Sequence, residues 1–219
     1  MHDPTTKLPA PPTEGLQAIE KFDEAAMDNS DNNALSLFPV DIVNQRLTTP
    51  MLRLPGERWN LREAGIAEEH FFLVYLRNKL GTRIHHANQR SHAPLLLLAC
   101  LPGELHEIGL LFFALSAISN GYRVLILGTN TPLQQIPAVL LRNSCSGVVL
   151  SCSAKPARDI MDSGLPELAS RISTPVFVGG KSAALYREKL EASGIIYLGE
   201  DITAGLPLVN EKSRAGETR

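Results

Sequence analysis

The sequence predicts an α/β protein in which an N-terminal helical bundle is followed by a Rossmann-like, flavodoxin-like domain built on a five-stranded parallel sheet. Two observations carry this prediction. Up to about residue 90, apolar residues recur at helical spacing and no segment alternates in the manner of a strand. After Pro94, short apolar runs alternate with helical stretches, and repeated strand–helix units form a parallel sheet with helices on both faces.

The N-terminal part is expected to be a flexible tail at 1–13 followed by a bundle of about four helices over 14–90. Leu16, Ile19 and Phe22 lie at helical spacing, Ser30 or Asp31 can cap a second helix, and Pro39 separates that helix from a third. The expected helices cover 14–27, about 31–38, 40–47 and 66 to about 86, the last being the longest.

The C-terminal part, 91–208, is expected to form the Rossmann-like domain, and the charged residues 209–219 are expected to be disordered. The expected strands are 95–100, 124–127, 148–150, 176–178 and 195–198. Helices fit between them at about 106–120, 133–143, 157–172 and 182–193. In doubly wound sheets of this kind, ligands bind at the carboxyl ends of the strands.

Composition excludes several classes of protein. The net charge is −2 and the basic residues are scattered, so direct DNA binding is not expected. Three cysteines without a Cys-x-x-Cys pair indicate neither a disulfide framework nor a zinc site. The N-terminus has no signal-peptide pattern and the apolar runs are too short for a bilayer, so a cytoplasmic protein with no membrane contact is expected.

Small residues and one imidazole follow the expected strands. Glu104 and His106 lie on the loop after the first strand, where an imidazole can bind a transition metal and a carboxylate can orient its second nitrogen. Gly109 leaves room for a bulky group at the start of the next helix. Taken alone, Glu104 and His106 are more typical of a surface pair. A single protein ligand suits a metal that arrives inside its own macrocycle.

Three separated elements resemble the B12-binding domain family. The run Glu104-x-His106-x-x-Gly109 is followed after 41 residues by Ser151, and then by Gly179-Gly180. Ser153 stands where the family has an aliphatic residue, and the last spacing is one residue short. The resemblance implies cobalamin as cofactor, His106 as the ligand that replaces the dimethylbenzimidazole base on cobalt, and a slot for the displaced tail. Residues of that slot would be Ser151, Ser153, Gly179 and Gly180.

A second pattern lies in the expected bundle, where Trp59 is followed after nine residues by Glu69-His70. It is similar to the B12-dependent photoreceptor regulators of the CarH and LitR type. The resemblance implies that Trp59 covers an upper adenosyl group and that Glu69 and His70 line its pocket. We do not expect the MerR-type DNA-binding domain of those regulators, because few residues precede the expected bundle. Asn60 stands where illuminated photoreceptors carry a second histidine ligand.

The resemblance therefore implies a sensor and not an enzyme, with no catalytic residues. In this reading the protein binds adenosylcobalamin, responds to light, and acts on transcription through a protein partner, such as a transcription regulator, or through homo-oligomer formation. Two alternatives stay open. One is a corrinoid methyl carrier of a methyltransferase system, which would hold methylcobalamin. The other is a photoreceptor that binds a bilin in addition to the corrin.

Overall fold

The structure is a computed structural model, and it describes residues 13–37, 64–89 and 92–216. By its internal contacts the chain divides into two units, Met1–Lys79 and Leu80–Arg219. The expected helix at 40–47, Trp59 and all of the expected tail except Thr13 lie outside the described residues. Within the described ranges, no helix is both long enough and apolar enough to cross a membrane.

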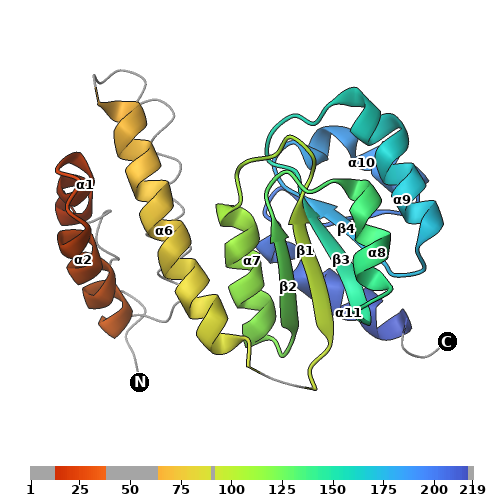
Figure 1. Ribbon diagram of the computed structural model, residues 1–219, viewed down its shortest axis with the longest axis horizontal. Coiled ribbons are helices and arrows are strands. Elements are labelled where there is room, and N and C mark those ends of the chain that lie inside the picture. Colours follow the sequence, from red (N-terminus) through yellow and green to blue (C-terminus); the bar gives the residue numbers. More distant parts are fainter. Residues whose placement is uncertain (1–12, 38–63, 90–91, 217–219) are drawn as a thin grey trace, which may run out of the picture. The chain divides into compact units, whose positions relative to one another are not determined.

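The first unit contains α1 (Thr13–Glu20), α2 (Glu24–Leu37) and most of α6 (Gly65–Ala87). Its apolar core includes Ile19, Met27 and Phe72. Asp28 on α2 accepts hydrogen bonds from the Tyr75 hydroxyl at 2.9 Å and from Lys79 Nζ at 2.6 Å, which ties α2 to α6. This is the N-terminal helical region that the sequence predicted (Figure 1).

The predicted single helix over 14–27 is wrong, because the chain breaks between α1 and α2. Phe22 has a φ of 54°, a left-handed conformation that ends α1. Asp23 Oδ1 then accepts a hydrogen bond from the Ala26 N–H at 2.9 Å and caps the start of α2. The predicted cap at Ser30 or Asp31 is also wrong, since both residues lie inside α2.

The second unit is built on a five-stranded sheet in the order β2-β1-β3-β4-β5, with every neighbouring pair parallel. This is the flavodoxin-like order, so the predicted fold class is confirmed. The strands are β1 (Leu95–Cys100), β2 (Arg123–Gly128), β3 (Cys145–Ser151), β4 (Val176–Gly179) and β5 (Ile196–Tyr197). The connecting elements are α7 (Ile108–Ser119), η2 (Leu133–Gln135), α8 (Ile136–Leu140), η3 (Ile160–Gly164), α9 (Leu165–Arg171), η4 (Ala183–Tyr186), α10 (Arg187–Ala192), η5 (Thr203–Gly205) and α11 (Leu206–Gly216).

Both faces of this sheet are buried, which explains the continuous apolar runs of its strands. In β1, Leu96 and Leu98 point to one face and Leu97 and Ala99 to the other, and all four are fully buried. Helices α7 and α11 contact each other and the sheet, while α8 and α9 contact each other beside the cluster that contains Leu97 and Ala99 (Figure 1). The sheet is therefore the middle of three layers.

The C-terminal residues 209–219 were expected to be disordered, and this expectation is wrong as far as residue 216. They continue α11, in which Val209 is fully buried and Ser213 is 3% exposed. Leu206, Val209 and Ser213 recur at helical spacing, so a narrow buried stripe runs along α11, while Glu211 and Lys212 are exposed.

The expected boundary between the two parts, at 90/91, also differs from the contact division, which falls inside α6. By its internal contacts the second unit begins at Leu80, within α6, and Leu80 and Ile84 in the last turns of this helix are buried. Asn88, one residue beyond α6, exchanges two hydrogen bonds with the backbone of Val124 in β2, at 2.8 Å and 3.0 Å. These two hydrogen bonds attach the segment that follows α6 to the sheet.

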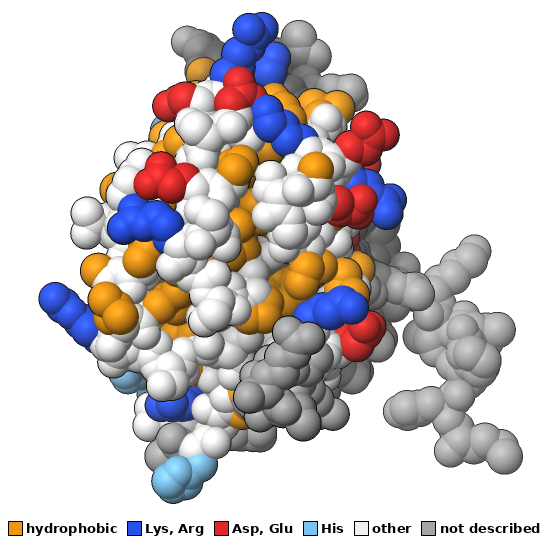
Figure 2. Space-filling view, turned by 90° about the vertical axis from the view of Figure 1, so that its right-hand side faces the viewer, with side chains coloured by type: hydrophobic (Ala, Val, Ile, Leu, Met, Phe, Trp, Pro, Cys, Tyr) orange, Lys and Arg blue, Asp and Glu red, His pale blue; other side chains and the backbone are white. Residues whose placement is uncertain are grey.

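Charged side chains of both signs are interspersed on the face shown in Figure 2. Within the second unit, charged side chains also form ion pairs, for example Arg187 with Glu191 at 2.9 Å and Arg171 with Glu167 at 3.3 Å. On that face no basic stripe gathers, in line with the scattered charge in the sequence.

Candidate functional site

The loop between β1 and α7 presents an exposed imidazole above a buried carboxylate. It begins with a turn in which the Glu104 N–H donates to the Leu101 carbonyl oxygen at 3.0 Å. Gly103, the third residue of this turn, has a φ of +80°, which a Pro-Gly turn of type II requires. The Glu104 side chain is 3% exposed and that of His106 is 69% exposed.

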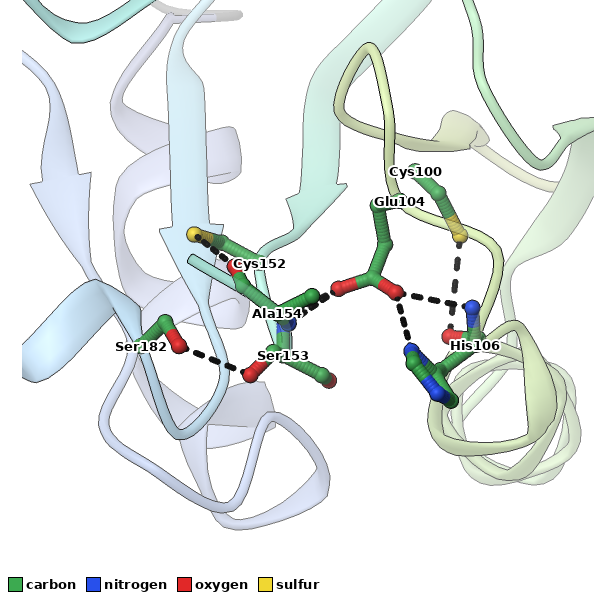
Figure 3. A network of polar contacts seen from close by, with 7 residues as sticks. All are labelled: Cys100, Glu104, His106, Cys152, Ser153, Ala154 and Ser182. Carbon is green, nitrogen blue, oxygen red and sulfur yellow. Dashed lines mark hydrogen bonds and ion pairs between the residues drawn. The ribbon is translucent and has the colours of Figure 1, made fainter. Parts of the chain in front are cut away.

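Glu104 joins this loop to the loop after β3 through both of its carboxylate oxygens (Figure 3). Oε1 lies 2.7 Å from the His106 backbone nitrogen and 2.7 Å from His106 Nδ1. Oε2 accepts hydrogen bonds from the backbone N–H of Ser153, at 2.7 Å, and from that of Ala154. One buried carboxylate therefore accepts four hydrogen bonds.

These contacts select the tautomer of the His106 ring. Burial opposes ionisation of Glu104, but the hydrogen bonds from Ala154, His106 and Ser153 outweigh it and hold the pKa of Glu104 below its usual value. An ionised carboxylate only accepts hydrogen bonds, so Nδ1 of His106 must carry the proton. In the neutral ring, Nε2 then keeps its lone pair, which is the form of histidine that binds a metal.

The predicted residues at the ends of β3 and β4 lie beside this network. Ser151 is the last residue of β3 and is 1% exposed. The Ser153 carbonyl oxygen accepts a hydrogen bond from the Ser182 hydroxyl at 2.8 Å. The Gly179 carbonyl oxygen accepts from the Cys152 N–H at 2.8 Å, so the two strand ends are bonded to each other.

Packing gives Gly179 and Gly180 a role that the sequence interpretation did not include. A Cβ on Gly180 would lie 2.6 Å from the Cys152 carbonyl oxygen, and its φ of +122° also excludes other residues. A Cβ on Gly179 would lie 3.0 Å from Cβ of Leu198. Close packing against backbone therefore requires glycine at 180, and at 179 it leaves little room for a side chain, whatever ligand passes beside them. Gly109 differs, because a Cβ there would meet nothing within 4 Å, which leaves the open space expected at the start of α7.

Two buried thiols flank the network. Cys100 Sγ lies 3.9 Å from the His106 carbonyl oxygen, and Cys152 Sγ lies 3.7 Å from that of Ala154. Burial, reinforced by the nearby Glu104 charge, raises the pKa of each thiol to about 12. Both side chains are therefore neutral at physiological pH.

The predicted residues of the helical region belong to the first unit. Glu69 is partly exposed and His70 is exposed on α6, and Trp59 lies outside the described residues. Their neighbour Glu68, which the sequence did not single out, is the buried acid of this stretch at 4% exposure.

Three residues of the site were missed by sequence reasoning. Ala154 contributes only its backbone N–H, and the Ser182 hydroxyl donates to the Ser153 carbonyl oxygen. Asn130, in the loop after β2, accepts a hydrogen bond from the loop that carries His106. A backbone donor can belong to almost any residue type, and a contact between two loops joins distant parts of the sequence, so neither produces a recognisable motif. The one available signal was that Asn130 and Ser182 stand among the small residues that follow strands.

The site fits a metal held from one side by an imidazole. His106 is oriented, exposed and free to offer Nε2, and Gly109 leaves open space nearby. In the part of the chain that the structure describes, no group of three or more His, Cys, Asp or Glu residues could hold a metal ion.

Known proteins are similar to the chain over most of its length. It is 28% identical over 189 residues to the HTH-type transcriptional repressor CarH of Myxococcus xanthus, covering 85% of this chain and 63% of that protein. It is 29% identical over 162 residues to the HTH-type transcriptional repressor CarA of the same organism, covering 74% and 54%. The predicted resemblance to CarH-type regulators is confirmed, and the chain spans between about half and two thirds of these relatives' lengths.

A solved structure shows the same fold. The monomethylamine corrinoid protein of Methanosarcina barkeri aligns with a TM-score of 0.66 at 15% identity, covering 89% of this chain and 95% of that chain. The family model of the B12 binding domain matches residues 94–206, which is just over half of the chain and includes the whole Glu104–His106 network. The chain belongs to the B12-binding domain family and is a cobalamin-binding protein.

Proposed function

We propose that this protein is a cobalamin-dependent regulator, in which His106 is the lower axial ligand of cobalt. One observation carries the assignment of the ligand. The buried, ionised Glu104 accepts a hydrogen bond from Nδ1–H of His106 and leaves Nε2 available on an exposed ring. A surface histidine without such a partner would adopt either tautomer and many orientations.

The other residues of the site would serve the cofactor in two places. Ser151, Ser153, Gly179 and Gly180 end the strands at which the displaced base and its tail would lie, and Gly109 leaves room for the ring beside α7. The prediction that Trp59, Glu69 and His70 contact an upper adenosyl group is kept as part of the proposal, and it derives from the resemblance alone.

The relatives supply the regulatory part of the proposal, because two of them are transcriptional repressors. Bound adenosylcobalamin would supply a cobalt–carbon bond that light can break. The response to light would then be a change in self-association or in contact with a protein partner, such as a transcription regulator.

The Trp59→Ala variant should release adenosylcobalamin faster than wild type does, while its affinity for hydroxocobalamin stays within about twofold of wild type, as stopped-flow absorbance would show.

The test is reconstitution with adenosylcobalamin in the dark, followed by desalting, absorbance spectra and size-exclusion chromatography before and after green light. We expect a coloured protein with the spectrum of a histidine-bound, base-off cobalamin, and a changed elution volume after light. His106→Ala should lose that spectrum, whereas the exposed His92→Ala should keep it.

A colourless wild-type protein after desalting would refute the assignment of His106. A coloured protein whose spectrum and elution are insensitive to light would refute the light-dependent part. Retention of methylcobalamin but not of adenosylcobalamin would favour the methyl-carrier alternative.

A further inference from the structure

The loop that carries His106 is held from a second side, by a residue of the loop after β2. Asn130 Oδ1 accepts a hydrogen bond from the Gly103 N–H at 2.8 Å. The Asn130 N–H donates in turn to the Glu104 carbonyl oxygen at 2.9 Å. Asn130 thus bonds two consecutive residues of the loop, Gly103 and Glu104, the second of which lies two positions before His106.

We infer that Asn130 is a positioning residue, which fixes the backbone of Gly103 and Glu104 and so holds His106 ready to bind the metal. The inference rests on the proposed role of His106. It assigns the β2 loop a function in cofactor binding, although no side chain of that loop is required to touch the cofactor.

The turn at the start of the loop explains why an acceptor is needed at this point. Its own hydrogen bond runs from the Glu104 N–H to the Leu101 carbonyl oxygen, so the Gly103 N–H is left without a partner inside the turn. Asn130 supplies that partner. The geometry also selects the residue, because Asn130 has a φ of 49°, a left-handed conformation that asparagine tolerates better than most side chains.

The position of the Glu104 backbone decides what its carboxylate can reach. The carboxylate accepts from His106 on one oxygen and from Ser153 and Ala154 on the other. Hydrogen bonds weaken steeply when their angle or length departs from the optimum, so a shifted backbone would lose one of the two sides. A loop held in its binding conformation before the cofactor arrives has less order to gain on binding.

Three substitutions separate the two properties of Asn130. Asn130→Asp keeps an acceptor oxygen and tolerates a positive φ. Asn130→Gly keeps the conformation and loses the acceptor, and Asn130→Ala loses both. Asn120→Ala is the control, because Asn120 is an exposed asparagine whose side chain also bonds to the backbone, here as a donor to the Ser116 carbonyl oxygen at 2.9 Å, at the far end of α7 from His106.

The first measurement uses the cofactor-free protein and follows exchange of the Gly103 amide proton by NMR. We expect the Gly103 amide to be protected in wild type and in Asn130→Asp. In Asn130→Gly its protection factor should fall about 3- to 10-fold, which corresponds to the net free energy of one hydrogen bond. Unchanged protection in Asn130→Gly would overturn the inference at this step.

The second measurement is the affinity of each variant for hydroxocobalamin, with the absorbance signature of histidine ligation. We expect Asn130→Gly to bind about 3- to 10-fold more weakly and Asn130→Ala more weakly still, with a larger share of the base-on form. Asn130→Asp and Asn120→Ala should match wild type in both respects. If Asn130→Gly loses protection at Gly103 yet binds as wild type does, Asn130 has a structural role alone and the inference fails.

Failure of the proposed function gives a different result. In that case wild type itself would show no histidine-bound cobalamin, whatever the exchange of the Gly103 amide.

Discussion

Replacement of Glu104 by glutamine tests the network around His106 most directly. The glutamine side chain has the same size, but its single oxygen can accept from only one of the two donor pairs. Its NH₂ group would then face the other pair, which consists either of the two His106 donors or of the Ser153 and Ala154 amides. A donor would meet two donors at a buried position.

The expected cost follows from these contacts. Leaving a buried donor without an acceptor costs about 1–3 kcal/mol, and two donors are affected. Because His106 is exposed, water can reach part of the site and the loss should lie at the lower end, at about 2–4 kcal/mol of the free energy of unfolding of the second unit. Glu188→Gln makes the same chemical change at an exposed position and should stay within about 0.5 kcal/mol.

Calorimetry of the cofactor-free proteins and titration with hydroxocobalamin measure the two consequences. The melting temperature of the second unit should fall by about 5–12 °C in Glu104→Gln. Cobalamin affinity should fall about 10- to 100-fold, the usual effect of removing the partner of a metal-bound histidine. If both quantities match those of Glu188→Gln, Glu104 neither supports the loop nor orients the ring, and the reasoning is wrong.

Three further predictions address other parts of the structure. His106→Ala should leave the melting temperature within about 2 °C, since the ring is exposed, while abolishing the histidine-bound spectrum in a cobalamin titration. Gly180→Ala should destabilise the second unit by about 2–4 kcal/mol in urea unfolding, because its Cβ would meet backbone at 2.6 Å, whereas Gly81→Ala, in open space on α6, should be neutral or stabilising by up to about 1 kcal/mol. Hydrogen bonding and attraction by Lys79 lower the pKa of Asp28 below 3.8, so this stabilisation of the first unit is present above that pH and lost as the pH falls through the lower, folded-state value. An acid titration in which Asp28→Asn unfolds in parallel with wild type would contradict that linkage.

Much of the second unit could be predicted because its signals are local. Strands with both faces buried are continuous apolar runs, and each of the five runs became a strand within a few residues of its expected position. The Glu104–His106 contact could be predicted because both residues lie in one short loop. His106 is only two positions after Glu104, so its ring can reach the carboxylate.

The errors arose where tertiary contacts decide the structure. Ile19 and Met27 point into one core, so apolar spacing continues across the break between α1 and α2 and conceals it. In α11 a single stripe containing Val209 is enough to order a charged segment. Asn130 and the Gly180 contact with Cys152 depend on loops that meet only after the sheet has formed, so no sequence window contains both partners.

The suppressed ionisation of Cys100 and Cys152 has a chemical consequence for the proposed binding of cobalt by His106. Thiolates are soft, strong ligands and could compete with a neutral imidazole for cobalt, but thiols bind weakly. Near pH 7, both sulfurs beside the network remain capped by hydrogen because their pKa values lie near 12. Burial at this end of the sheet thus keeps Cys100 and Cys152 in the thiol form. Neither sulfur would therefore compete as a thiolate with Nε2 of His106 for the metal.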